Sequence, residues 1–193
     1  MAILKVLFAA GLCSSLALAD LVGVPTVPFT VTGSGSFNAF ETKHIVVDSR
    51  YANSTDTNGW TLIPPTLSQF AETFANDLAD FTDVSRNYLV EGDGPQDSTI
   101  FLTIDNCTEY RDAAGRWTSE AYTLEVKEDS VTISGASPLG VWWGTRTLLQ
   151  QVVLNNGSMA IGSGIDSPGW NTRGIFVRIC SVSQVSMLMH GLA

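Results

Sequence analysis

The sequence predicts an α+β domain in which two helices pack on one face of a mainly antiparallel sheet. Apolar residues recur at three- and four-residue steps in segments 67–81 and 138–152, which is the period of an amphipathic helix. Residues 121–127 and 130–134 instead alternate apolar and polar side chains across a short turn, which is typical of a β-hairpin. The expected order of elements is β-α-β-β-β-α.

The segment between residue 20 and the first helix is expected to contain one short strand between two irregular stretches. Asp20–Phe40 contains two prolines and a Gly-Ser stretch, and it predicts an extended, loosely structured lead-in. His44–Asp48 is a short run rich in β-branched residues and predicts a strand. The polar segment Asn53–Gly59 is expected to be an exposed loop.

The first helix begins after Pro64-Pro65, with Thr66 or Ser68 as the capping residue. Its expected apolar face consists of Leu67, Phe70, Ala71, Phe74, Leu78 and Phe81. A turn at Gly92–Pro95 then precedes a strand at Thr99–Ile104.

The second helix has clear signals at both ends. Ser137 is suited to the N-cap and Pro138 to the first turn, where a missing N–H does no harm. Asn155-Asn156-Gly157 ends the helix, with glycine suited to a left-handed C-cap. The apolar stripe is expected to be Val141, Trp142, Thr145, Leu148, Leu149 and Val152, and we expect both Trp142 and Trp143 to pack in the core. Trp117 and Trp170 are expected to be exposed or interfacial.

Residues 1–19 have the layout of a secretory signal peptide. Lys5 is followed by the apolar run Val6–Leu18 and by the small-x-small signal Ala17-Leu18-Ala19. The run is shorter than the roughly 20 apolar residues of a membrane span. We therefore expect cleavage before Asp20 and a secreted, extracellular protein; a buried N-terminal helix is the alternative.

The composition weighs against several function classes. A net charge of −9 makes nucleic acid an improbable partner, because its phosphates require Lys and Arg. The sequence also contains no basic patch that would favour binding to an anionic membrane. The two histidines, His44 and His190, are far apart, and no metal-ligand spacing or cofactor motif accompanies them. Ile161–Gly164 lacks a nucleophile elbow and is expected to be a polar loop.

Secretion would allow two kinds of covalent modification. Asn53, Asn106 and Asn156 each begin an Asn-x-Ser/Thr sequon and are candidate glycosylation sites. Cys107 and Cys180 would remain after removal of the signal peptide. An oxidising compartment permits a disulfide between them, and the sequence leaves this pairing open.

The second half of the chain carries a longer pattern. Strand-like Glu120–Leu124 and Val131–Ile133 precede the Gly144–Gln150 helix, and Pro168–Gly174 follows it. This succession resembles glycoside hydrolase family 20, the β-N-acetylhexosaminidases, at the point where a small α+β domain leads into a (β/α)8 catalytic barrel. The resemblance divides the chain into a signal peptide (1–19), a hexosaminidase N-terminal domain (20–165) and a truncated first barrel strand with a divergent tail (166–193).

The resemblance also implies a function. The family removes terminal N-acetylhexosamine from chitin oligomers or glycoconjugates by substrate-assisted catalysis, with an Asp-Glu pair that orients the acetamido group and protonates the leaving oxygen. No Asp-Glu dipeptide occurs in this sequence, and the Glu128-Asp129 pair is expected to be a solvated turn. We therefore expect an inactive fragment of a secreted enzyme, without catalytic residues, metal or cofactor.

Arg173 is the single substrate-binding candidate. By the resemblance, it matches a family arginine that binds sugar hydroxyls at the mouth of the barrel, so N-acetylhexosamine would be a partner only if a barrel were supplied. A surface or ion-paired arginine is the alternative for this residue. For the whole chain, the alternative is a stand-alone secreted glycan-binding or structural module.

Overall fold

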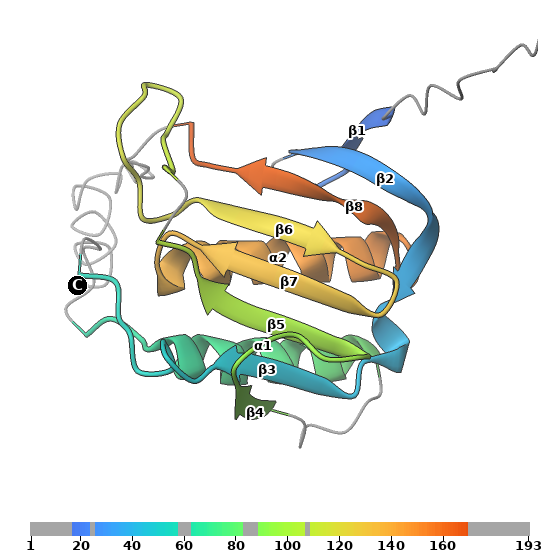
Figure 1. The fold of residues 1–193 in the computed structure, drawn as a ribbon, viewed down its shortest axis with the longest axis horizontal. Helices are drawn as coiled ribbons and strands as arrows, with labels where there is room; N and C mark the ends of the chain where they lie inside the picture. Colours follow the sequence, from blue (N-terminus) through green and yellow to red (C-terminus); the bar gives the residue numbers. More distant parts are fainter. Residues whose placement is uncertain (1–16, 24–25, 58–62, 83–88, 107–108, 170–193) are drawn as a thin grey trace, which may run out of the picture.

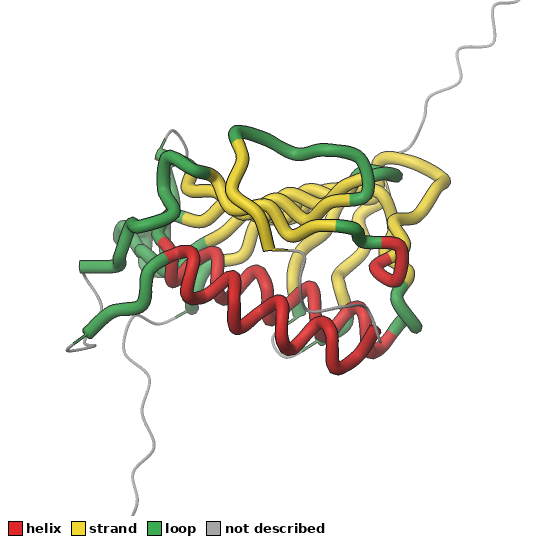
Figure 2. Tube along the Cα trace, turned by 90° about the horizontal axis from the view of Figure 1, so that it is seen from below, coloured by secondary structure: helices red, strands yellow, loops and turns green. Residues whose placement is uncertain are grey.

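A computed structural model describes residues 17–23, 26–57, 63–82, 89–106 and 109–169. Within this part of the chain, eight strands form one sheet and two long helices cover one of its faces (Figures 1 and 2). The elements are β1 (Ala17–Leu21), β2 (Val27–Asn38), the 3₁₀ turn η1 (Ala39–Glu41), β3 (His44–Asp48), α1 (Leu67–Thr82), β4 (Leu89–Gly92), β5 (Thr99–Ile104), β6 (Tyr122–Val126), β7 (Ser130–Gly135), α2 (Pro138–Leu154) and β8 (Ser158–Asp166). The predicted α+β class is confirmed.

The sheet has an antiparallel half and a parallel half. Its strand order is β1-β2-β8-β6-β7-β5-β3-β4. In this order, the neighbouring strands from β1 through β2, β8 and β6 to β7 are antiparallel. By contrast, β5 is parallel to both β7 and β3, and β3 is parallel to β4. Parallel neighbours require a crossover, and α1 supplies it between β3 and β4. All six residues of β5 are buried, in keeping with its place between two parallel neighbours.

Two sequence predictions on the antiparallel side were wrong. The lead-in contains β2, a strand of 12 residues, and Ile161–Gly164 lies within β8 rather than in a loop. The two strands pair with each other, and their register shifts between Val31 and Ser36, around the Gly-Ser stretch. A Cβ at Gly162 would lie 2.2 Å from the Thr30 carbonyl oxygen, so glycine allows this close approach. Glycine disfavours the strand conformation, but here the pairing of β2 with β8 outweighs this unfavourable propensity.

The helix α1 begins with a capping box. The Thr66 Oγ1 accepts a hydrogen bond from the Gln69 N–H at 3.2 Å, and the Gln69 Oε1 accepts one from the Thr66 N–H at 2.9 Å. This confirms Thr66 as the capping residue. Phe81 was expected in the core but is 54% exposed. The buried stripe extends to Ala75 and Ala79 on one side, and Phe81 lies at its opposite flank near the end of the helix.

The helix α2 begins and ends as predicted. The Ser137 Oγ accepts a hydrogen bond from the Leu139 N–H at 3.0 Å, and Asn156 and Gly157 have left-handed φ values of 49° and 81°. Between these ends the helix lies directly on the β6–β7 hairpin. A Cβ at Gly140 would lie 2.2 Å from the Ala121 carbonyl oxygen, and one at Gly144 would lie 2.4 Å from the Ile133 Cγ2.

The two tryptophans of α2 have different environments. Trp142 is half-buried between the helices, where its ring centroid is 5.1 Å from that of Phe70 and 3.7 Å from the Arg146 guanidinium carbon. Arg146 also forms an ion pair with Asp77 of α1. The prediction that Trp143 packs in the core was wrong: it is 39% exposed, because the next position on a helix is turned by about 100°.

Asp48 ends β3 and fixes the turn that follows. Its buried carboxylate accepts hydrogen bonds from the Arg50 Nη2 at 2.7 Å and the Thr103 Oγ1 at 2.5 Å. Burial acts to raise the pKa of the Asp48 carboxyl, but these hydrogen bonds and the charge of Arg50 outweigh it and hold the pKa below its usual range.

We expect Gly140→Ala to lower the free energy of unfolding by about 1–3 kcal/mol, because the added methyl group meets backbone atoms that cannot rotate away. Urea denaturation measures the change. The matched control is Gly94→Ala, since a Cβ at Gly94 would meet nothing within 4 Å; its effect should stay within about 0.5 kcal/mol. Equal stability of the two variants would show that α2 does not lie this close to the hairpin.

We expect Asp48→Asn to destabilise the fold by about 1–3 kcal/mol at neutral pH, because it weakens charge-assisted hydrogen bonds. Since the folded-state pKa is depressed, the Asp48 contribution is fully present above the unfolded-state pKa of about 4 and is lost as the pH falls through the folded-state value. As the pH is lowered from about 7 to about 3, the urea concentration at the unfolding midpoint should therefore fall with a shallower slope in this variant than in the wild type. Asp97→Asn, at an exposed turn, should retain the wild-type slope. A wild-type slope in Asp48→Asn would contradict this assignment.

Candidate functional site

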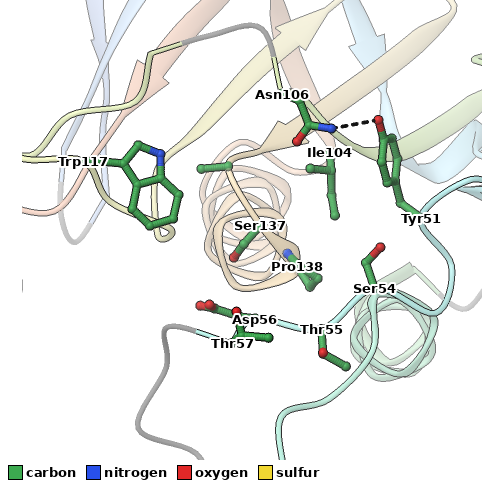
Figure 3. Close-up of a pocket in the computed structure, with 11 residues that line it drawn as sticks. Tyr51, Ser54, Thr55, Asp56, Thr57, Ile104, Asn106, Trp117, Ser137 and Pro138 are labelled. Carbon is green, nitrogen blue, oxygen red and sulfur yellow. Dashed lines mark hydrogen bonds between the residues drawn. The ribbon is translucent and has the colours of Figure 1, made fainter.

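A surface hollow of about 320 Å³ lies where β3 and β5 end and α2 begins (Figure 3). Four segments far apart in the sequence contribute to it. Its walls are Tyr51 and Ser54–Thr57 after β3, Ile104 and Asn106 at the end of β5, Trp117, and Ala136–Pro138 at the start of α2. The carboxyl ends of parallel strands are a frequent place for ligand sites in open α/β sheets.

Trp117 stands on a turn that Asp112 organises. The buried Asp112 carboxylate accepts hydrogen bonds from the backbone N–H groups of Ala114 and Arg116, both at 2.9 Å, and from the Arg116 Nε at 2.8 Å. These Arg116 contacts hold the pKa of the Asp112 carboxyl below its usual range. Trp117 follows directly, and 55% of it is exposed. The sequence prediction that it is exposed is confirmed.

Hydrogen bonds tie the walls of the hollow to one another. The Asn106 Nδ2 donates to the Tyr51 Oη at 3.1 Å, which joins the segments after β3 and β5 (Figure 3). Ser119 joins the segment after β3 to the start of α2, because its Oγ donates to Asp56 at 2.9 Å and its carbonyl oxygen accepts from the Ser137 Oγ at 2.9 Å. The expectation of an exposed loop was therefore wrong for Asp56, which is 6% exposed.

A second polar chain anchors the end of β8. The Tyr122 Oη is 2.5 Å from the Thr147 Oγ1 of α2, and Tyr122 is also paired with Asp166 across the sheet. Burial raises the pKa of the Tyr122 hydroxyl and that of the Asp166 carboxyl. Asp166, the first residue of the segment that was predicted to begin the barrel, is thus paired with a residue that contacts α2.

The three predicted glycosylation sites are all exposed. Asn53 lies in the segment after β3, Asn106 lines the hollow, and Asn156 lies at the other end of α2. The predicted sugar-binding Arg173 and both cysteines, Cys107 and Cys180, lie outside the described residues. Sequence analysis did not identify the hollow, since no local pattern shows that its segments meet.

The part of the chain that the structure describes contains no group of three His, Cys, Asp or Glu residues placed to hold a metal ion. In the same residues, neither helix is both long enough and apolar enough to cross a bilayer. Asp56 is the single acidic side chain among the residues that line the hollow.

Comparison with known proteins identifies the fold. Residues 25–163 match the family model described as glycosyl hydrolase family 20, domain 2. No match is found among curated proteins.

Three solved structures illustrate the likeness. A family 20 exo-β-N-acetylglucosaminidase from Vibrio harveyi, in complex with N-acetylglucosamine, has a TM-score of 0.50 and 22% identity over 92% of this chain and 25% of that chain. The family 20 β-N-acetylhexosaminidase from Streptomyces coelicolor A3(2) has a TM-score of 0.46 and 21% identity over 74% of this chain and 25% of that chain. The β-hexosaminidase of Streptomyces plicatus has a TM-score of 0.47 and 20% identity over 73% of this chain and 25% of that chain.

The present chain thus spans about a quarter of the length of these enzymes, and at this identity the likeness concerns the fold alone. The family model, in contrast, covers well over half of the chain and includes β2 to α2. The chain therefore belongs to glycoside hydrolase family 20, of which it carries domain 2.

Proposed function

We propose that the chain is the non-catalytic α+β domain of a secreted β-N-acetylhexosaminidase and does not hydrolyse glycosides by itself. The observation that carries this proposal is the family match, which places residues 25–163 in domain 2 of the family. The residues themselves support it. Glycosidases use two carboxyl groups, or a carboxyl group and the substrate's own acetamido group. The hollow offers one carboxylate, that of Asp56, which is already engaged with Ser119.

The outer surface of the helix layer supports a role within a larger enzyme. Trp143, Val153 and Leu154 on α2 and Phe81 on α1 are exposed large apolar residues, although both helices bury their other face on the sheet (Figure 2). Exposed apolar side chains on one face could be covered by another domain. We propose that this face contacts the rest of the enzyme.

The chemistry of the whole enzyme follows from its relatives as a proposal. The solved Vibrio harveyi relative is an exo-β-N-acetylglucosaminidase in complex with N-acetylglucosamine. We propose that the enzyme to which this domain belongs removes terminal N-acetylhexosamine from chitin oligomers or glycoconjugates. Arg173 is the residue proposed to contact the sugar once a barrel is present.

Secretion is proposed on the signal-peptide pattern at residues 1–19 and on the sequons. Cleavage before Asp20 would leave Asp20 and Leu21 of β1 paired with Pro28 and Val27. Asn53, Asn106 and Asn156 are all exposed, as glycan attachment requires.

We expect the purified chain to release no nitrophenol from an aryl N-acetylglucosaminide above the rate in buffer, because it lacks the family's Asp-Glu pair. A complete family 20 enzyme in the same assay is the positive control. Hydrolysis that increases in proportion to the concentration of the pure chain would overturn the proposal.

When the full chain is expressed in eukaryotic cells, we expect the medium to contain a chain that begins at Asp20 and carries N-glycans. Mass spectrometry of the intact protein should show the loss of one glycan in each of Asn53→Gln, Asn106→Gln and Asn156→Gln. Asn76→Gln is the matched control, because Asn76 is exposed but begins no sequon. An uncleaved chain retained in the cells, or a secreted chain without glycan, would contradict secretion with glycosylation.

A further inference from the structure

We propose that the hollow at the carboxyl ends of β3 and β5 binds one neutral pyranose, with Trp117 as its stacking platform. The proposal concerns this domain's own surface and does not depend on the proposed role in a larger enzyme. A cavity of about 320 Å³ is near the lower end of the roughly 300–1,000 Å³ found for small-molecule sites, which suits one sugar ring better than an oligosaccharide.

Trp117 supplies the apolar part of such a site. Its indole is 55% exposed and borders the hollow, and the Asp112–Arg116 contacts hold the turn that carries it. The apolar area that this ring exposes to water does not contribute to the stability of the fold. The ring can instead stack on the C–H face of a pyranose. Tyr51 lines another part of the same hollow (Figure 3).

The remaining walls supply hydrogen-bonding groups suited to sugar hydroxyls. The polar lining side chains are those of Tyr51, Ser54, Thr55, Thr57 and Asn106, whereas Asp56 and Ser137 also line the hollow but are buried and hydrogen-bonded to Ser119. Hydroxyl groups can both donate and accept, as sugar hydroxyls do. The Asn106–Tyr51 and Ser119–Asp56 hydrogen bonds hold two of the walls in place before a ligand arrives. Binding therefore requires little additional ordering of the protein.

The charge of the lining selects against anionic ligands. Among the residues that the structure describes, no Lys, Arg or His lines the hollow, and Asp56 is acidic. The whole chain carries a net charge of −9. A phosphorylated or carboxylated sugar would meet repulsion without a compensating cation. A neutral pyranose meets no such penalty.

The same sugar could come from two sources. Asn106 begins a sequon, and its Nδ2 lies in the wall of the hollow. A glycan attached there would start at the rim, so its first N-acetylglucosamine could occupy the hollow. Without that glycan, a sugar from solution could bind.

The first experiment uses the full chain without glycan. The chain is made in bacteria with ¹⁵N-labelled tryptophan, and N-acetylglucosamine is added while the indole N–H signals are followed by NMR. Trp117→Phe assigns the Trp117 signal. We expect a saturable shift of this signal with a dissociation constant on the order of 1 mM. Sorbitol, an open-chain polyol, should cause no saturable shift.

Matched variants separate the site from general effects. Both Trp117 variants lack the Trp117 signal, so their binding is measured from the NMR signals of the sugar itself. Trp117→Ala should weaken binding by at least about tenfold, a loss of roughly 1.4 kcal/mol, while Trp117→Phe should retain part of the affinity. Trp143→Ala should bind as the wild type does, because Trp143 is exposed on α2 but does not line the hollow. Absence of a saturable Trp117 shift, or equal weakening by Trp117→Ala and Trp143→Ala, would overturn the proposal.

The second experiment identifies the source. If the sugar attached at Asn106 occupies the hollow, the Trp117 signal of the glycosylated chain should already be shifted before any sugar is added. Added N-acetylglucosamine should then not bind. Asn106→Gln from the same cells should bind the added sugar again. If the glycosylated chain instead binds the added sugar as well as the bacterial chain does, the site takes sugar from solution. The hydrolysis assay is a separate readout, so failure of sugar binding would leave the proposed function standing.

Discussion

At Gly140 and Gly144, α2 approaches the β6–β7 hairpin so closely that a side-chain carbon at either position would collide with it. A contact at this distance allows one position of the helix along the sheet. It places the N-terminus of α2, with Ser137, beside the hollow, and it turns Trp142 and Arg146 toward α1. The helix layer and the candidate site therefore depend on the same contact.

Polar contacts then connect this helix to more distant parts of the chain. Arg146 pairs with Asp77 and fixes α1 beside α2, while Thr147 meets Tyr122, whose partner across the sheet is Asp166. Most of these groups are buried or half-buried, where an unpaired polar group would be costly. These contacts connect the helix layer to the sheet and to the edge that carries the hollow.

Local signals explain which parts of the fold were predictable. The caps at Thr66 and Ser137 and the alternation in β6 and β7 are encoded within a few residues, and the structure confirms them. The strands β2 and β8 escaped prediction because glycine, which normally weakens a strand, is needed where they approach each other. Phe81 and Trp143 were misplaced because helical spacing alone does not define how wide the buried stripe is. The hollow could not be predicted, since Tyr51, Trp117 and Ser137 meet only in the folded chain.

Hydrogen–deuterium exchange of the purified chain tests most directly whether α2 and the hairpin form one unit. Regions that unfold together exchange with the same free energy of opening. The amides of α2 should therefore exchange as slowly as those of β5, β6 and β7, and all should approach the free energy of global unfolding. Exchange in α2 that is faster by orders of magnitude, while β5–β7 remain protected, would show that the helix opens on its own and would contradict this account.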